Sequence, residues 1–350
     1  MITRVEISDF LDLSTKFPVI DVRSPGEYNK GHIPGSFNIP LFNDNERSEI
    51  GKKYKRVSRE AAVYAGLEFA GTKLVSLIKQ SKKIAGKKEI LIHCWRGGMR
   101  SENMAWLFSV AGLKPYVLTG GYRAYRHHIR KKLTENQKIV ILGGKTGSGK
   151  TEILYEMEKL GHQIIDLEGL ANHKGSAFGA LGQEIQPTTE QFTNNLFDVW
   201  KDLDPNRSVW IEDECKNIGT VSISEELFEK MNKAPVFVVE MIKELRIERL
   251  VKEYSFFDSQ LLEESILKIQ KRLGGVNTSE CIKAVHEKNF ARAIDISLTY
   301  YDKTYIYGLE KKKKRIGGYI SSEDNSLAVT ARKIIDIKNK KIRNAPAWWV

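Results

Sequence analysis

The sequence predicts an α/β protein of two consecutive domains, with a helical and basic part at the end of the second. Short apolar runs alternate with stretches of helical spacing along its 350 residues, a pattern typical of parallel sheets covered by helices. In each half, one apolar run leads into a Gly-rich turn: ILIHCWRGGMRS from Ile90 and ILGGKTGSGKT from Ile141. A chain of this length can bury a separate core in each of two domains.

Four segments are predicted in order along the chain. They are a first domain over residues 1–121, a basic linker helix over 122–135, a second domain over 136–310 with a helical C-terminal half, and a basic tail over 311–350. Strands are predicted at 17–23, 89–95, 115–121, 138–144, 162–168, 208–214 and 234–240. Helical spacing predicts a helix over 99–112 and several between 242 and 305.

Composition limits the cellular setting. No apolar run approaches the roughly 20 residues that a membrane helix needs, and the first residues lack the apolar core of a signal peptide. The cysteines Cys94, Cys215 and Cys281 are too few and too scattered for a disulfide framework or a zinc cluster. We therefore expect a cytoplasmic protein with no membrane contact, in a reducing compartment that leaves a lone thiol free to react.

The net charge of +12 is unevenly distributed. Residues 1–135 hold 24 Lys and Arg against 13 Asp and Glu, residues 136–310 hold 21 against 28, and residues 311–350 hold 11 against 3. Basic ends around an acidic middle indicate a polyanionic partner, and aromatic side chains lie within the basic stretches 121–132 and 310–319. Solvated surface charge explains any one of these clusters equally well.

The first Gly-rich turn places Cys94 at the end of a buried strand and before a helix. Backbone N–H groups and the positive end of the helix stabilise an anion at such a position and lower the pKa of a thiol. Gly97 and Gly98 allow tight curvature, while Arg96 and Arg100 add positive charge. We interpret Cys94 as a nucleophile, or the holder of a persulfide or selenide, beside an anionic donor; the alternative is an inert buried cysteine.

At these residues the sequence resembles the rhodanese family. The loop CWRGGMRS is accompanied by DVRSPGEYNKGHIPGSFNIP from Asp21 to Pro40, which matches that family's D-x-R-x-x-x-E-Y and G-H-I-P-G segments. The resemblance implies a rhodanese-like fold and a transferable chalcogen on Cys94. The spacing from Cys94 to Arg100 is longer than in common sulfurtransferases and matches the related dual-specificity phosphatases, so a larger atom, a larger donor or a phosphoester fits it.

The second turn matches the phosphate-loop motif G-x-x-x-x-G-K-[ST] in its required setting, after an apolar strand and before a helix. The predicted diphosphate-binding residues are Gly144, Lys145, Thr146, Gly147, Ser148, Gly149, Lys150 and Thr151. Backbone amides would surround the diphosphate, Lys150 would reach its terminal oxygens, and Thr151 would face a magnesium ion. The second domain is thus expected to be P-loop NTPase-like.

A metal-side carboxylate is predicted in VWIEDE, with Asp213 the first candidate and Glu212 the next. An acidic turn after a buried strand is the alternative interpretation. Glu214 receives no role. The sequence shows no motif for a nucleotide base and no group for activating water, which favours binding or transfer over hydrolysis.

Further stretches link the two domains to one family. They are GGYRAYR from Gly120, DLEGLANHKGSAFGALG from Asp166, IEDECKNIG from Ile211 and RLGG from Arg272. Together with both loops they resemble the tRNA 2-selenouridine synthase family over most of the chain, the basic tail excepted. Where that family usually has a serine after its acidic triplet, this sequence has Cys215, which we interpret as structural because it lacks the Gly–Arg loop.

The resemblance implies a reaction at the wobble 2-thiouridine of lysine, glutamate and glutamine tRNAs, in which selenium from selenophosphate replaces sulfur. It also implies S-geranylation from geranyl diphosphate on the way, because an alkylated sulfur leaves C2 far more readily than a thione. The P-loop would hold the diphosphate, and Cys94 with Arg96, Gly97, Gly98 and Arg100 the activated selenium. No tightly bound cofactor is expected beyond a candidate Mg²⁺, and the enzyme that supplies selenophosphate is a candidate partner.

The stretch 173–182 is small and apolar with one Phe, so it fits a wall for the isoprenoid chain or a lid, and a plain Gly-rich loop fits equally well. For His173, proton transfer is weighed against an unrelated surface histidine, which we favour.

Three other functions remain open from sequence. The chain could be a tRNA sulfurtransferase or geranyltransferase alone, a nucleotide switch whose rhodanese unit recruits partners, or a phosphatase, although CWRGGMRS offers no acid for a leaving group. The preferred account requires a sulfur of Cys94 that solvent can reach and a turn after Gly144 that admits an oxyanion.

Overall fold

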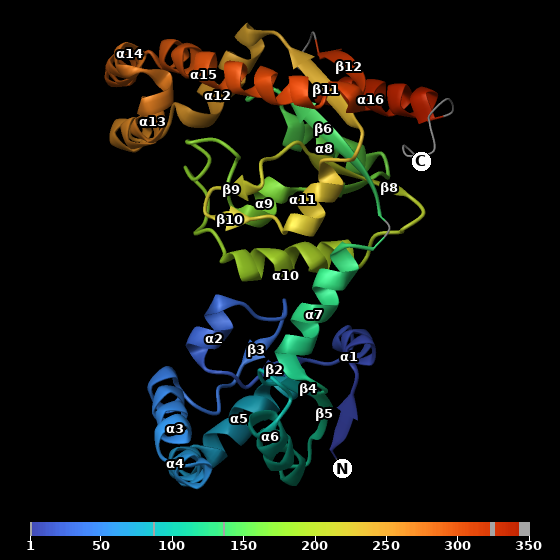
Figure 1. Ribbon diagram of the computed structural model, residues 1–350, viewed down its shortest axis with the longest axis vertical. Helices are drawn as coiled ribbons and strands as arrows, with labels where there is room; N and C mark the ends of the chain where they lie inside the picture. The colour runs from blue at the N-terminus through green and yellow to red at the C-terminus, as the bar shows by residue number, and fades with distance from the viewer. Residues whose placement is uncertain (1, 87, 136, 323–325, 343–350) are drawn as a thin grey trace. The chain divides into compact units, whose positions relative to one another are not determined.

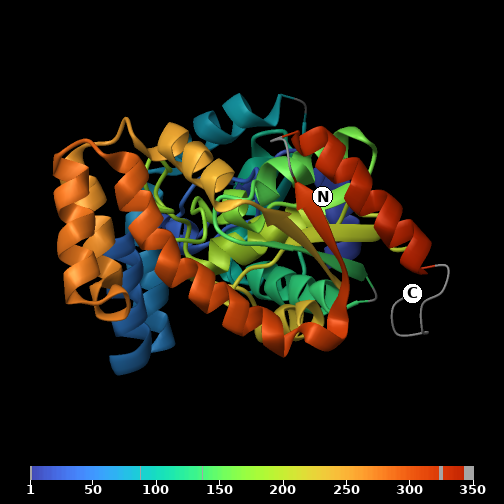
Figure 2. The same ribbon diagram turned by 90° about the horizontal axis from the view of Figure 1, so that it is seen from above.

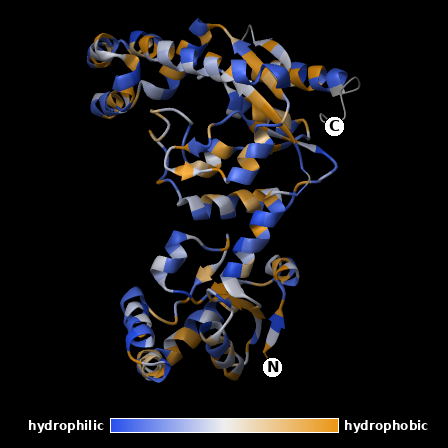
Figure 3. Cartoon of the chain, viewed as in Figure 1, coloured by the Kyte–Doolittle hydropathy of each residue, from blue (hydrophilic) through white to orange (hydrophobic). Residues whose placement is uncertain are grey.

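The computed structural model describes residues 2–86, 88–135, 137–322 and 326–342 (Figure 1). It divides into two compact units between Leu133 and Thr134, and each unit has its own sheet. The strands of both sheets are largely apolar, as the colouring of Figure 3 shows, and apolar residues on the helices pack against them. The fold is therefore the predicted α/β class, with one parallel sheet in each half.

The sheet of the first unit has five parallel strands in the order β1-β5-β4-β2-β3. Their bounds are β1 Thr3–Val5, β2 Val19–Asp21, β3 Phe37–Asn38, β4 Glu89–His93 and β5 Lys114–Leu118. Strand β4 lies in the centre, and Asp21 of β2 is in register with His93 of β4. Because the strands are parallel, the residues that follow β2, β4 and β5 meet at one edge of the sheet.

Seven helices complete the first unit: α1 Ile7–Ser14, α2 Pro25–Lys30, α3 Asp44–Arg56, α4 Arg59–Gly71, α5 Leu74–Ala85, α6 Met99–Val110 and α7 Gly121–Leu133. The core packs Ile90 and Ile92 of β4 against Phe108 of α6, all of them without exposed surface. Tyr122, Tyr125, Ile129 and Leu133 of α7 are also buried. The segment predicted as a linker helix over 122–135 is instead an integral helix of the first unit, because one of its faces is apolar.

The sheet of the second unit has five parallel strands in the order β12-β11-β6-β8-β7. Their bounds are β6 Lys138–Gly144, β7 Gln163–Ile165, β8 Ser208–Glu212, β11 Val236–Met241 and β12 Ile316–Ser322. A separate antiparallel pair joins β9 Asn217–Ile218 to β10 Val221–Ser222. Strand β6 is central, so the Gly-rich turn that follows it lies in the middle of the sheet edge.

Helices of the second unit are α8 Lys150–Lys159, α9 Leu167–Ala171, α10 Thr189–Trp200, α11 Glu225–Met231, α12 Lys243–Tyr254, α13 Ser259–Leu273, α14 Gly275–His286, α15 Phe290–Lys311 and α16 Leu327–Ile342, with a 3₁₀ turn η1 Lys313–Arg315. The views in Figures 1 and 2 agree that α13 and α14 lie side by side next to the first part of α15. Helices α12 to α15 form a cluster with its own apolar core, which confirms the helical spacing seen after residue 242.

The predicted basic tail over 311–350 is not a separate segment as far as residue 342. Strand β12 pairs with β11 as the edge strand of the second sheet, and α16 packs on β12 and α8. A side chain at Gly318 would come within 3.0 Å of Ile337, so this glycine allows the close approach of α16. Residues 343–350 lie outside the described part of the chain.

Among the described residues, no single helix is long and apolar enough to span a membrane. The bent pair α4–α5 meets the length and composition criteria only when its two helices are taken together.

Candidate functional site

Cys94 follows the last residue of β4 and is nearly enclosed by the loop that leads into α6. Only 4% of the surface of Cys94 is exposed. The sequence-based account required a thiol that solvent can reach, so the thiol is more covered than predicted. Its Sγ lies 3.2 Å from Oγ of Ser101, and that hydroxyl also lies 3.0 Å from the carbonyl oxygen of Gly98. A donor therefore has little direct access to the sulfur in this structure.

The surroundings of Cys94 favour the thiolate. Burial alone would raise the pKa of the thiol, but the hydrogen bond with Ser101, the charge of Arg100 and the backbone N–H groups of Arg96 and Ser101 lower it below its ordinary value. Arg100 thus acts through its guanidinium, whereas Arg96 acts through its backbone and its side chain is exposed. Ser101 was not singled out in the sequence, although it ends the CWRGGMRS loop.

Two of the glycines at this loop are required by backbone contacts. Gly97 has a φ of 68°, and a side chain there would come within 2.6 Å of the carbonyl of Leu118. Gly121 has a φ of 60°, and a side chain there would come within 2.4 Å of the carbonyl of Cys94. Gly98 has a negative φ and open space beside it, so the predicted need for curvature holds at Gly97 and not at Gly98.

The turn after β5 is hydrogen-bonded to the backbone of the cysteine loop. The N–H of Tyr122 donates to the carbonyl of Cys94 at 2.8 Å, and the N–H of Arg123 donates to the carbonyl of Trp95 at 3.0 Å. The stretch that begins at Gly120 therefore contributes backbone donors that hold the loop, which gives the GGYR segment a structural role.

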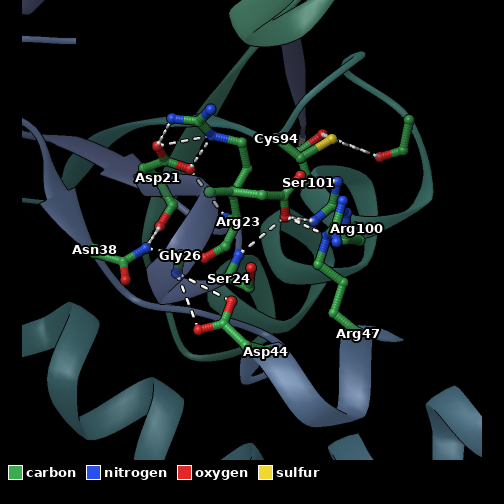
Figure 4. A network of polar contacts seen from close by, with 12 residues as sticks. Asp21, Arg23, Ser24, Gly26, Asn38, Asp44, Arg47, Cys94, Arg100 and Ser101 are labelled. Carbon is green, nitrogen blue, oxygen red and sulfur yellow. Dashed lines mark hydrogen bonds and ion pairs between the residues drawn. The ribbon is translucent and has the colours of Figure 1, made fainter. Parts of the chain in front are cut away.

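Glu27 of α2 is paired with both Arg47 of α3 and Arg100 of the cysteine loop. Figure 4 shows these two arginines near each other. The carboxylate of Glu27 accepts hydrogen bonds from Arg100 at 2.7 Å and is paired with Arg47 at 2.9 Å. Burial opposes ionisation of Glu27, but Arg100, the N–H of Ser24 and Arg47 lower its pKa. The pair fixes Arg100 beside the thiol, and its partners are 73 residues apart in sequence.

The D-x-R segment forms a buried frame next to the loop. Arg23 and Asp21 are 1% and 0% exposed and make a bidentate ion pair, with the guanidinium of Arg23 3.8 Å from the ring centre of Tyr122. Asn38 donates to the carbonyls of Asp21 and Arg23 at 3.0 and 2.9 Å. These residues position the sheet edge that carries Cys94, because their carboxylate, guanidinium and amide groups are hydrogen-bonded to one another and to the backbone.

In the second unit, the P-loop turn is open to a cavity of about 690 Å³. Six of the eight predicted residues line it: Gly144, Thr146, Gly147, Gly149, Lys150 and Thr151. Gly147 and Gly149 have φ of 80° and 75°, which is the left-handed backbone that such a loop needs. Ser148 is buried and Lys145 lies 4.0 Å from Asp302, so neither of these two lines the cavity. The turn after Gly144 therefore borders open space, and the binding of an oxyanion there stays a prediction.

Lys150 is surrounded by carboxylates. Burial would lower its pKa, but Glu168, Glu214, Asp213 and Glu212 raise it, so the lysine remains a cation. Burial and the neighbouring Glu168 raise the pKa of Glu214 to about 8, and burial and Asp166 raise that of Glu212 well above its ordinary value. The crowding of acids indicates a site that accepts further positive charge.

Thr151 and Asp213, predicted to hold magnesium, have separate partners. The hydroxyl of Thr151 donates to Glu168 at 3.2 Å, and Asp213 is paired with Lys312. Glu168 also donates its N–H to Glu212 at 2.8 Å, so the carboxylate nearest to Thr151 is Glu168, which follows β7 in the DLE stretch. Sequence reasoning assigned no role to Glu168.

A hard divalent cation fits these side chains. Oε2 of Glu212 and Oδ2 of Asp213 are buried without a hydrogen-bond partner, and carboxylate and hydroxyl oxygens are what Mg²⁺ prefers. Among the described residues, no group of three or more His, Cys, Asp and Glu side chains forms a metal cage. Mg²⁺ at phosphate sites uses one or two carboxylates with water and substrate oxygens, which is the kind of site these residues offer.

Helices α12 and α15 hold the P-loop. Arg246 is 2% exposed, makes a bidentate ion pair with Asp302 at 2.7 and 2.8 Å, and lies 3.2 Å from the carbonyl of Thr146. Since Arg246 and Asp302 are 56 residues apart, neither was evident as a site residue in the sequence.

An apolar cavity of about 40 Å³ adjoins the P-loop cavity, and the two share Thr146, Ser176, Leu250, Tyr254 and Tyr301 in their walls. The rest of its wall consists of Phe178, Leu262, Ile266, Cys281, Val285, Phe290, Ala293, Ile294, Ser297 and Leu298. Ser176 and Phe178 come from the stretch 173–182, which thus contributes to an apolar wall.

His173 and the two remaining cysteines, Cys215 and Cys281, differ in their surroundings. His173 does not line either cavity, and burial and Lys268 lower its pKa, so it is not placed for proton transfer there. Cys215, interpreted from the sequence as structural, is exposed and lines the P-loop cavity. Cys281 is buried against Ser297 in the helical cluster.

Comparison with known proteins identifies both halves. Residues 137–334 match the model of the tRNA 2-selenouridine synthase AAA domain, and residues 6–128 match that of the rhodanese-like domain. A tRNA 2-selenouridine synthase of Shewanella sediminis is 35% identical over 340 residues, covering 85% of this chain and 89% of that protein. Those of Sulfurovum sp. and Shewanella frigidimarina are 33% and 32% identical, each over 85% of this chain and 90% of their own length.

Both domain models match in the order that the two units have in the structure, and these relatives are matched over nearly their whole length. The chain belongs to the tRNA 2-selenouridine synthase family of enzymes.

Proposed function

We propose that this chain replaces the sulfur of wobble 2-thiouridine in tRNA with selenium from selenophosphate, and that S-geranylation by geranyl diphosphate precedes the replacement. The family carries the first part of this proposal. The presence of two different anion sites, one at Cys94 and one at the P-loop, is the observation that carries the second part.

The first step is alkylation. The thione sulfur of 2-thiouridine forms a bond to C1 of geranyl diphosphate, the C1–O bond breaks, the base loses its N3 proton, and diphosphate leaves. The P-loop suits the leaving group because Lys150 remains a cation and the helix α8 begins at the loop. A bound Mg²⁺ would stabilise the charge of the departing diphosphate, and Thr151, Glu168 and Asp213 are the residues that would hold it.

The apolar cavity supports a site for the geranyl chain. It adjoins the P-loop cavity through five shared wall residues, so a chain attached to the diphosphate could extend into it. Its volume of about 40 Å³ is smaller than the roughly 150 Å³ in which benzene binds, so helices α13 to α15 must yield for a ten-carbon chain to enter.

The second step is selenium transfer. Selenium of selenophosphate forms a bond to C2, geranylthiol leaves with a proton, and water then breaks the Se–P bond to release phosphate. We place the donor at the Cys94 loop because Arg100 and the N–H groups of Arg96 and Ser101 stabilise an anion there. Selenium in selenophosphate is already fully reduced, so direct attack on C2 balances without the oxidant that a Cys94–selenium bond would need.

The substrates are tRNAs with wobble 2-thiouridine, those for lysine, glutamate and glutamine. The enzyme that makes selenophosphate is a partner in this scheme, because a reactive selenium anion is best passed on directly.

The experiment is nucleoside mass spectrometry of 2-thiouridine tRNA treated with purified protein, with each donor withheld in turn. We expect S-geranyl-2-thiouridine when selenophosphate is withheld, unchanged tRNA when geranyl diphosphate is withheld, and 2-selenouridine when both are present. Formation of 2-selenouridine without geranyl diphosphate would refute the alkylation step.

A further inference from the structure

Helix α3 of the first unit contributes no residue to the core. It packs along α4, where Ile50 lies near Gly66, but none of its 13 residues is buried. Figure 3 shows α3 as a largely hydrophilic helix. A helix of this length that buries so little apolar surface gains little from packing, which indicates that its exposed side chains serve another purpose.

The turn between α3 and α4 gathers unpaired positive charge. We call Lys52, Tyr54, Lys55, Arg56, Val57 and Arg59 the hairpin tip. All six are exposed, and the structure gives Lys52, Lys55, Arg56 and Arg59 no acidic partner among the described residues. Lys53, the remaining cation of this turn, is paired with Glu49.

Helix stability explains only part of this charge. Lys55 and Arg56 lie in the last turn of α3, where cations stabilise the negative end of a helix. Arg59 is the first residue of α4, where the positive end of the helix disfavours a cation. The N-terminus of α4 has its own cap in Ser58 and an acid, Glu60, in its first turn, so the charge of Arg59 is what an external anion would compensate.

The hairpin tip also exposes apolar and aromatic surface. Tyr54 is 62% exposed and Val57 is 72% exposed, between the four unpaired cations. Phosphate contacts by Lys and Arg with an aromatic side chain available for stacking are the combination that binds RNA. An acidic protein segment would match the charges but would leave the exposed Tyr54 ring without a specific role.

The other end of α3 is fixed to the cysteine loop. Asp44 accepts the N–H of Gly26 at 3.0 Å, and Arg47 shares the carboxylate of Glu27 with Arg100. The 13 residues of α3 extend over about 20 Å at 1.5 Å per residue. A polyanion bound at the hairpin tip would therefore lie at the far end of a helix whose first turn is anchored beside the thiol site.

We propose that the hairpin tip binds the sugar-phosphate backbone of the substrate tRNA, about 20 Å along α3 from the loop of Cys94. The RNA partner in this inference rests on the proposed function. The contacts are electrostatic and sequence-independent, so they add affinity and orient the RNA without reading its bases.

The test measures the Kd of 2-thiouridine tRNA, without donors, over a range of salt concentrations. The variant is Lys55→Ala/Arg56→Ala/Arg59→Ala, and the control is Lys79→Ala/Lys82→Ala/Lys83→Ala on α5, which removes the same charge from exposed positions near a helix C-terminus. We expect the first triple to weaken binding by about tenfold or more at 0.1 M salt and to reduce the slope of log K against log salt by about 2. The control should change Kd by less than about twofold.

Kinetics and folding separate the outcomes. The hairpin triple should raise KM for tRNA at an unchanged kcat. Its thermal unfolding should stay within a few degrees of the wild type, because the loss of two favourable charges at the end of α3 is partly offset by the loss of the unfavourable Arg59 at the start of α4. An unchanged Kd, or equal losses in both triples, would overturn the inference. The binding measurement uses no selenium or geranyl donor, so it remains decisive even if the proposed chemistry is refuted.

Discussion

The carbonyl of Cys94 accepts the N–H of Tyr122 at 2.8 Å, so the loop that carries the thiol and the turn after β5 form one backbone assembly. Gly121 lies at their closest approach, where a side chain would come within 2.4 Å of the same carbonyl. The geometry of the thiol therefore depends on a residue that lies 27 positions further along the chain and has no side chain of its own.

Substitution Gly121→Ala should abolish selenium incorporation while leaving the P-loop unit intact. The new Cβ would displace the Cys94 carbonyl and occupy a backbone with a φ of 60°. The matched control is Gly35→Ala, which has a φ of 74° but open space around it, and which should cost only about 1 kcal/mol of backbone strain. Equal 2-selenouridine yields from both variants would show that the contact is unimportant.

The pKa of Cys94 should rise when its anion-stabilising partners are removed. Ser101→Ala removes a hydrogen bond to the sulfur, and Arg100→Ala removes the nearest cation. Each should therefore lower the rate at which iodoacetamide labels Cys94 at neutral pH. Arg96→Ala should have little effect on this rate, because Arg96 acts through its backbone N–H. Peptide-level mass spectrometry of iodoacetamide labelling against pH, in a Cys215→Ser background, measures this. A rate that falls equally in all three variants would contradict the assignment.

The central strands of the sheets were predicted well from the sequence, and the edge strands were predicted poorly. Strand β6 has the predicted bounds 138–144. A buried parallel strand is a continuous apolar run, and the P-loop motif that comes directly after this run marks its end. Strand β12 was missed, since IGGYISS follows five basic residues and becomes a strand only through its pairing with β11. Long-range pairing of this kind leaves no periodic signal along the chain.

The site was predicted at the level of motifs and not of partners. Cys94, Arg100 and the P-loop residues were evident because their neighbours in sequence are also their neighbours in space. The roles of Glu27, Glu168 and Asp302 were not predicted, because each acts on a residue that is distant in the chain, although the first two lie within quoted family stretches. Sequence also could not show that the thiol of Cys94 would be almost completely covered.

Removing the acid from the buried Arg246–Asp302 pair should destabilise the second unit and weaken diphosphate binding. Asp302→Asn leaves the guanidinium of Arg246 without compensation at 2% exposure, which should cost about 3 kcal/mol. The control Asp295→Asn breaks the half-buried pair of Asp295 with Lys243, which solvent screens more than the Arg246 pair, between the same two helices and should cost less than about 1 kcal/mol. Urea unfolding and titration with geranyl diphosphate measure both effects, and equal costs would contradict the structural role of Asp302.

The carboxyl of Glu214 should make stability depend on pH. Burial and Glu168 raise the pKa of Glu214 to about 8 in the folded chain, above the ordinary value of 4.5. Between pH 4.5 and pH 8 the carboxyl is therefore protonated in the folded state and ionised in the unfolded state. The stabilisation is present below about pH 4.5 and is lost as pH rises through 8. Glu214→Gln should therefore raise the unfolding temperature at pH 9 and change it little at pH 5.

Exposed Glu226 provides the control for this pH profile. Glu226→Gln should give an unfolding temperature that follows the wild type at both pH values. A Glu214→Gln difference that is the same at pH 5 and pH 9 would show that Glu214 does not hold the proton.

Magnesium should increase the affinity for geranyl diphosphate, because the unpaired oxygens of Glu212 and Asp213 lie among crowded carboxylates. Calorimetric titration with Mg²⁺ and with EDTA should show weaker binding without the metal. Thr151→Val should lose the dependence on Mg²⁺ and keep the metal-free affinity, whereas Lys150→Ala should lose most of both. Identical affinities with Mg²⁺ and with EDTA would count against a metal at this site.

The central claim is that the two anion sites carry out successive steps on one base, and paired variants test it most directly. Purified Cys94→Ala and Lys150→Ala proteins are each supplied with 2-thiouridine tRNA and both donors, and the nucleosides are measured by mass spectrometry. The account predicts S-geranyl-2-thiouridine without 2-selenouridine from Cys94→Ala, and unmodified 2-thiouridine from Lys150→Ala. Normal 2-selenouridine from either variant would contradict it.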